Sequence, residues 1–294
     1  IPLTLPRTTA TLDFPQGRLQ LAGQLTPKDL LIDGALVELA NTRVEVRGAV
    51  ARTPDHPTVL DLSGTVTWEE LRDLPLVSWP GLEAWNLAGA AEVEVRFEGR
   101  LSDWPSATIQ SRLRSRAMRV RHLPLQQFVC TAEQRNRVLR VWIPSGLLAG
   151  GKLTAELTVD HRPDTQGYFL EADLIGMDLA ALSQAIPAWR SRSMVGRTSA
   201  HALLSGRWKE RATWRGEGWL NASGERLGDL PLLEKVFRGL FGMLAERLGL
   251  ETLRRAQITE ASVRWRLADE RLTTDGLRLG GAAGLEPISI YAKG

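Results

Sequence analysis

The sequence predicts a mainly β fold, in which a long curved antiparallel sheet forms a trough-like groove with a few short helices and one amphipathic helix. Three observations support this prediction. Many segments alternate apolar and polar residues, turn residues such as Asp33-Gly34 and Gly150-Gly151 separate them, and part of the chain repeats itself. Because successive side chains of a strand point to opposite faces, each alternating segment has one apolar and one polar face.

The repeat is marked by features that recur at one constant offset. They are Gly89 with Gly196, Gly99 with Gly206, and Leu123-Pro124-Leu125 with Leu230-Pro231-Leu232. We therefore predict three parts: residues 1–66 as strands that continue an upstream repeat, residues 67–177 as a first β repeat with a short helix, and residues 178–294 as a second repeat with an amphipathic helix. Two copies of a β-rich unit indicate an array, which offers an extended surface rather than a single pocket.

Three helices are expected. The first runs from Thr67 to Leu74 and opens with the capping-box pattern Thr67-x-x-Glu70. The second runs from Asp178 to Ile186 and stops at Pro187. The third covers about residues 231–250, where apolar residues recur at three- and four-residue steps and give one continuous stripe.

These helices are too few to cover the apolar face of so many strands. A sheet folded into a trough satisfies the pattern, and a sandwich with a dry core satisfies it as well. If the trough is not filled by its own side chains, it is a channel for an apolar ligand. The candidate groove-lining residues are Val93, Val95, Phe97, Val263, Trp265, Leu267, Ile288 and Ile290. The third helix is predicted either to cap or gate the groove or to pack into it permanently, through Phe237, Leu240, Phe241 and Leu244.

The composition argues against nucleic-acid binding. There are 37 Lys and Arg residues against 34 Asp and Glu, so the net charge is only +3. The densest cationic group is Arg112, Arg114, Arg116, Arg119 and Arg121. We interpret it as a solvated strand face, with a stripe facing phosphate or anionic lipid head groups as the alternative.

No pattern of residues indicates an enzyme, a metal centre or a cofactor. The single cysteine, Cys130, is interpreted as a small buried hydrophobe. Residues 146–152 have phosphate-loop spacing, but Leu153 follows Lys152 where that motif needs Ser or Thr, so we predict a hairpin turn. The four histidines are scattered and none has a second ligand at metal-binding spacing, so structural roles are expected for all of them.

No run of apolar residues approaches the roughly 20 that a membrane-spanning helix needs. The chain begins at Ile1 and stops at Gly294, just after a segment that reads as a strand in progress. We therefore expect it to be a segment of a longer protein.

The second repeat resembles the C-terminal region of the AsmA-like family. The resemblance rests on the order and spacing of the following features: Gly176-Met177-Asp178-Leu179, Gly196, Gly206, Gly216-Glu217-Gly218, Gly224, Leu230-Pro231-Leu232, the amphipathic helix, Ala261-Ser262-Val263, Leu272 to Leu277, and Gly280. It covers residues 150–294 well and the earlier part more loosely. The sequence departs from the family at Ala268-Asp269-Glu270-Arg271, where members typically turn on an Asp-Gly pair.

The resemblance implies a bacterial envelope protein that extends through the periplasm, with a parent chain anchored in the inner membrane. It further implies a groove that moves phospholipid between the inner and outer membranes, with proteins of both membranes as partners. An apolar groove suits this task because exposing acyl chains to water costs about 0.8 kcal/mol per CH₂. The main alternative is a β scaffold without lipid cargo that assists outer-membrane protein assembly. A third interpretation, a carbohydrate-binding module, rests on the ten tryptophans.

Overall fold

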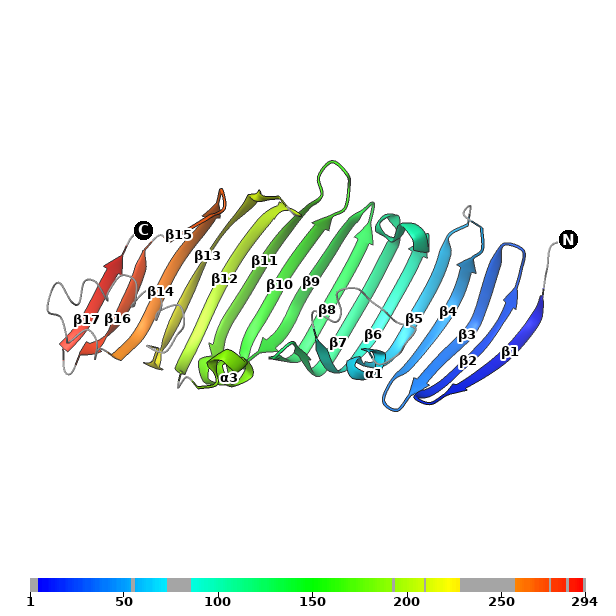
Figure 1. Ribbon diagram of the computed structural model, residues 1–294, viewed down its shortest axis with the longest axis horizontal. Coiled ribbons are helices and arrows are strands. Elements are labelled where there is room, and N and C mark those ends of the chain that lie inside the picture. Colours follow the sequence, from blue (N-terminus) through cyan, green and yellow to red (C-terminus); the bar gives the residue numbers. More distant parts are fainter. Residues whose placement is uncertain are drawn as a thin grey trace. The chain divides into compact units, whose positions relative to one another are not determined.

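The computed structural model describes residues 5–53, 56–72, 86–191, 194–208, 210–227, 257–274, 276–283 and 286–292. Over these residues the protein has seventeen strands and only short helices, which confirms the predicted mainly β class (Figure 1). The chain divides into two compact units, one of Ile1–Gly146 with Glu156–Gly167 and one of Leu147–Ala155 with Tyr168–Gly294.

The first unit is an antiparallel meander in which each of the strands β1 to β8 pairs with the next along the chain. Its elements are β1 (Leu5–Phe14), β2 (Gly17–Leu25), β3 (Asp29–Leu39), β4 (Arg43–Ala51), β5 (Thr58–Thr67), α1 (Trp68–Arg72), β6 (Leu87–Gly99), the 3-10 helix η1 (Leu101–Ser106), β7 (Thr108–Val120), β8 (Leu123–Arg135) and most of β9 (Val138–Leu148).

The second unit is also an antiparallel sheet. Its elements are the first half of β10 (Gly151–Asp160), nearly all of β11 (Gly167–Asp178), α3 (Leu179–Ala185), the 3-10 helix η2 (Pro187–Trp189), β12 (Val195–Arg207), β13 (Glu210–Arg226), β14 (Gln257–Ala268), β15 (Arg271–Thr274), β16 (Leu277–Ala283) and β17 (Glu286–Ala292). β14 pairs with β13, β15 and β16, and β16 pairs with β17.

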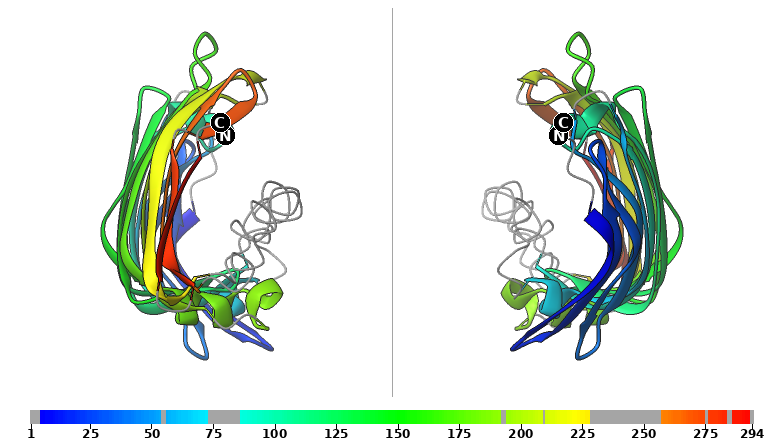
Figure 2. Two further views of the ribbon diagram at one scale, coloured as in Figure 1. Left: turned by 90° about the vertical axis from the view of Figure 1, so that its left-hand side faces the viewer. Right: turned by 90° about the vertical axis from the view of Figure 1, so that its right-hand side faces the viewer.

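Both sheets are curved. In Figure 2 the strands of each unit, seen along the sheet, bend along their length and leave one concave face. In the first unit α1 packs against β5 and β6 and lies on the concave side. Val66 and Ala91, which face each other across β5 and β6 near this helix, are only 4% and 2% exposed. In the first unit the concave face is therefore the apolar one.

Two of the predicted helices are confirmed, with one correction. Asp178 caps α3, since its carboxylate accepts hydrogen bonds from the backbone N–H groups of Ala180 and Ala181. The capping box predicted for α1 is wrong. Instead of reaching back to Thr67, the Glu70 carboxylate accepts hydrogen bonds from the backbone and side-chain N–H groups of Asn41, because the β3–β4 turn lies beside the helix.

The order β5–α1–β6 recurs as β11–α3–β12, so each repeat places one short helix between two strands. The compact units divide the chain elsewhere, within β9 to β11, and the boundaries 1–66, 67–177 and 178–294 stay a prediction. The predicted helix at 231–250 lies outside the described residues.

The β14–β15 hairpin turns on Asp269 and Glu270, whose φ angles are 50° and 61°. Two successive positive φ angles define a type I′ turn, which favours glycine at its second position. Glu270→Gly is therefore expected to stabilise the second unit by about 1 kcal/mol, because a left-handed conformation costs an ordinary residue about that much. Urea unfolding measures the change. A loss of stability would mean that the turn adopts another conformation.

Candidate functional site

The candidate site in the first unit is a set of side-chain rows that run across the strands on the concave face. Strand register aligns one side chain from each strand in such a row. The row at Val95 contains, from β1 to β8, Ala10, Leu21, Ala35, Val46, Leu62, Val95, Ser111 and Ala132. The row at Val93 contains Leu12, Leu19, Val37, Val44, Gly64, Val93, Leu113 and Cys130. Eight strands about 4.8 Å apart make each row about 34 Å long.

These rows are only partly shielded from water. Val93, Val95 and Phe97 are half-buried, while Glu94 and Arg96 between them are exposed on the other face. The structure thus brings three predicted lining residues together on one face. An extended acyl chain is about 15 Å long, since two of them span the hydrocarbon core of a bilayer, which is about 30 Å thick. A row about 34 Å long is therefore longer than one acyl chain.

Cys130 belongs to this face, opposite Leu113 of β7. Burial raises the pKa of its thiol, so the reactive thiolate is disfavoured. Its position fits the small hydrophobe expected from the sequence.

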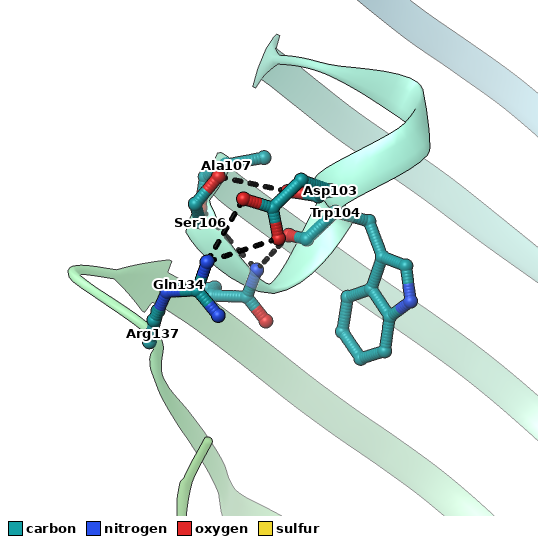
Figure 3. Close-up of polar contacts among 6 residues, drawn as sticks. All are labelled: Asp103, Trp104, Ser106, Ala107, Gln134 and Arg137. Atoms are coloured by element: carbon teal, nitrogen blue, oxygen red, sulfur yellow. Dashed lines mark hydrogen bonds and ion pairs between the residues drawn. The ribbon is translucent and has the colours of Figure 1, made fainter. Parts of the chain in front are cut away.

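A 3-10 helix bounds the concave face at the end of β6 that is remote from α1. The row at Phe97 ends on β8 at Gln134, which is 0% exposed. The Gln134 side-chain amide donates hydrogen bonds to the backbone carbonyls of Trp104 and Ala107, at 2.6 and 3.3 Å (Figure 3). Because Gln134 lies in an apolar-face row, these bonds hold η1 over that face.

A second contact fastens the same turn. One guanidinium nitrogen of Arg137 lies 2.9 and 3.2 Å from the two carboxylate oxygens of Asp103 (Figure 3). The indole of Trp104 meets the His161 ring edge to face, with ring centres 5.3 Å apart.

The apolar rows of the first unit are therefore bounded by two helical segments, with α1 at one end of the strands and η1 at the other. The sequence signal for η1 was weak, since Asp103-Trp104-Pro105-Ser106 has no apolar periodicity.

In the second unit Val263, Trp265 and Leu267 share one face of β14. They stand opposite Leu220, Gly218 and Gly216 of β13. The indole of Trp265 lies across the two glycines, since a Cβ at Gly218 would lie 2.5 Å from the Trp265 Cζ2 atom. Small residues on one strand thus make room for the large ring of the next. The Trp265 ring thus occupies the space that side chains at positions 216 and 218 would fill.

Part of the apolar face of the second unit is covered, as the face of the first unit is near α1. Val263 is 8% exposed, and its neighbours Ala222, Ala261 and Leu279 are between 3% and 6% exposed. Trp265 and Leu267 stay half-buried. Ile288 and Ile290 lie in β17, and its register pairs them with Gly281 and Leu279. The predicted cap or gate residues Phe237, Leu240, Phe241 and Leu244 lie outside the described residues.

The opposite face of the first unit carries mixed charge. Arg112 stands opposite Glu94 and Arg114 opposite Glu92, and all four side chains are exposed. On this face each of the two arginines stands beside a glutamate of the neighbouring strand, so the opposite charges compensate each other. This is the solvated strand face expected from the sequence. The phosphate-loop spacing at 146–152 is likewise a hairpin: β9 ends at Leu148, Ala149 and Gly150 turn, and β10 starts at Gly151.

The interpretation of His201 was incomplete. It lies mid-strand on the polar face, as expected, but Asp173 of β11 reaches it, with His201 Nδ1 2.9 Å from Asp173 Oδ1. Glu171 completes a group in which the three ligand-type atoms lie within 4.8 Å of one another. Spacing within one segment could not reveal this group, because His201 lies 28 residues after Asp173 and meets the two carboxylates only through the pairing of strands.

The chain matches no family model, no curated protein and no solved structure. In the part of the chain that the structure describes, no helix is long and apolar enough to cross a bilayer.

Proposed function

We propose that this chain is a non-enzymatic segment of a bridge-like periplasmic protein, whose apolar groove carries phospholipid between the inner and outer membranes. In this proposal the parent chain belongs with the AsmA-like proteins and is anchored in the inner membrane, and proteins of both membranes are its partners. The observation that carries it is the half-exposed apolar face of the first unit, with rows about 34 Å long across eight strands.

The chemistry of this face suits a cargo that moves. Leu21, Val46, Leu62 and Val95 are aliphatic and half-buried, so each makes weak, non-directional contacts. Shielding an acyl chain from water gains about 0.8 kcal/mol per CH₂, and neighbouring positions along a row offer similar contacts. A chain on such a surface can shift from strand to strand without breaking a specific bond. Its polar head group can stay in water at the open side.

The alternative is a scaffold without lipid cargo that assists outer-membrane protein assembly. The coverage of Val263, Ala261 and Leu279 in the second unit favours this alternative, since a covered face has no room for an acyl chain. The two functions therefore make opposite predictions about what touches the apolar face in the cell.

Site-specific photocrosslinking tests the proposal. A photoreactive amino acid at Val95 is expected to capture phospholipid in cells that make the parent protein, because this side chain is half-buried in an apolar row. The matched control is the same label at Glu94, one residue away on the opposite face. In the second unit the pair is Leu267 and Arg266, since Val263 is itself too covered to accept a label.

Capture at Val95 and not at Glu94, together with phospholipid in native mass spectra of the purified chain, would support a groove for lipid. Protein adducts at Val95 without lipid would favour the scaffold. Equal capture of lipid at Val95 and Glu94 would contradict both, since it would mean that lipid contacts the chain without regard to its apolar face.

A further inference from the structure

A group of metal-ligand side chains lies on the polar face of the second unit, opposite the face that carries Val263 and Trp265. Glu171 and Asp173 are two residues apart on β11, so both side chains lie on the same face of that strand. On the neighbouring strand β12, His201 lies between Ala200 and Ala202, whose side chains are on the apolar face. The side chain of His201 is therefore on the polar face. Its imidazole therefore meets the two carboxylates on the polar side, within the 4.8 Å that encloses all three ligand atoms.

The imidazole is held in place from two directions. Its Nδ1 atom lies 2.9 Å from a carboxylate oxygen of Asp173. Trp219 of β13 stacks on the other side, with ring centres 6.4 Å apart and planes inclined by 20°. A side chain fixed in this way loses little conformational freedom when it binds a ligand.

Among the described residues, no Lys or Arg forms an ion pair with either carboxylate of the group. Asp173 pairs with His201, when that imidazole is protonated. Two carboxylates so close together repel each other, and a divalent cation removes that repulsion.

The ligand types and distances select the class of ion. Mixed imidazole and carboxylate ligands suit first-row transition ions such as Zn²⁺, whereas Mg²⁺ and Ca²⁺ take oxygen ligands. Zn²⁺ binds such atoms at about 2.0–2.2 Å, so two ligand atoms 2.9 Å apart can contact one ion.

We propose that Glu171, Asp173 and His201 form a binding site for a divalent transition-metal ion, with Zn²⁺ as the reference ion. In the metal-free protein the imidazole N–H at Nδ1 donates to Asp173. On binding, Nδ1 releases its proton to water and its lone pair binds the metal, while Glu171 and Asp173 each supply an oxygen. Water fills the remaining positions, because the group lies at the surface.

Titration of the purified chain with Zn²⁺ in a calorimeter tests the site. We expect one binding event, and His201→Ala and Asp173→Asn should each weaken it by about ten-fold or more. His122→Ala and Glu217→Gln are the matched controls: His122 is an exposed histidine elsewhere, and Glu217 is a carboxylate on the polar face of β13. Both controls should bind Zn²⁺ as the parent chain does. Circular dichroism checks that each variant is folded.

X-ray absorption at the zinc edge should show nitrogen and oxygen ligands without sulfur, which excludes Cys130 as the ligand. The proposal is overturned if the chain does not bind Zn²⁺, if folded His201→Ala binds it unchanged, or if sulfur ligates the ion. Photocrosslinking at Val95 tests the lipid groove independently of zinc binding. A chain that does not bind Zn²⁺ would therefore contradict the metal site without contradicting the proposed lipid function.

Discussion

Gly218→Ala is expected to destabilise the second unit by about 2 kcal/mol and to displace the indole of Trp265. A Cβ at this position would lie 2.5 Å from the indole Cζ2 atom and would also approach the backbone carbonyl of His201. Inserting one methyl group into a closely packed site typically costs 1–3 kcal/mol, because side chains or backbone must move. Urea unfolding measures the loss of stability, and near-ultraviolet circular dichroism reports the movement of the indole.

Gly280→Ala is the matched control, since a Cβ there would meet its nearest neighbour, Glu260, at 3.4 Å, an ordinary contact distance. It should change stability by no more than about 0.5 kcal/mol. In a Trp265→Leu background the cost of Gly218→Ala should shrink, because the smaller side chain leaves room for the methyl group. Equal costs in both backgrounds would assign the cost to the backbone carbonyl of His201, to which the Cβ would lie closer still, and not to the indole.

Alternation of apolar and polar residues sufficed to predict the strands and the two faces, because a strand's side chains alternate with a period of two whatever its neighbours are. Val93, Val95 and Phe97 share a face for this reason alone. The N-cap residue Asp178 and the stop at Pro187 likewise predicted the helix from Asp178 to Ile186, which the structure has as α3 (Leu179–Ala185). The capping box at Thr67 was wrong because Glu70 found a partner in Asn41, 29 residues earlier, which local sequence does not reveal.

The parts of the site that sequence could not reveal all depend on strand register. Trp265 lies over Gly218 because β13 and β14 are aligned in one register out of several possible ones, and a shift by one residue would place the ring opposite Glu217 or Trp219. The meeting of His201 with Asp173 depends on register in the same way. The bond from the Gln134 amide to the turn after β6 joins residues 30 apart, which local sequence does not reveal either.

A carboxylate placed in the middle of the apolar rows is expected to abolish lipid binding. Val46 and Val95 belong to the same row of the first unit, on β4 and β6, with Leu62 between them. Because both side chains are half-buried, Val46→Glu with Val95→Glu leaves the new carboxylates access to water, and the sheet should stay folded. An acyl chain crossing the row would have to desolvate these charges, at a cost of several kcal/mol.

Each 1.4 kcal/mol weakens binding ten-fold, so phospholipid that copurifies with the double variant should fall at least ten-fold. Extraction and mass spectrometry of lipid from equal amounts of protein measure it. Val95→Leu preserves the apolar row and Glu94→Gln changes only the opposite face, so both should copurify as much lipid as the parent chain. If the double variant is folded and its lipid content is unchanged, the apolar rows do not hold the lipid, and the scaffold function gains support.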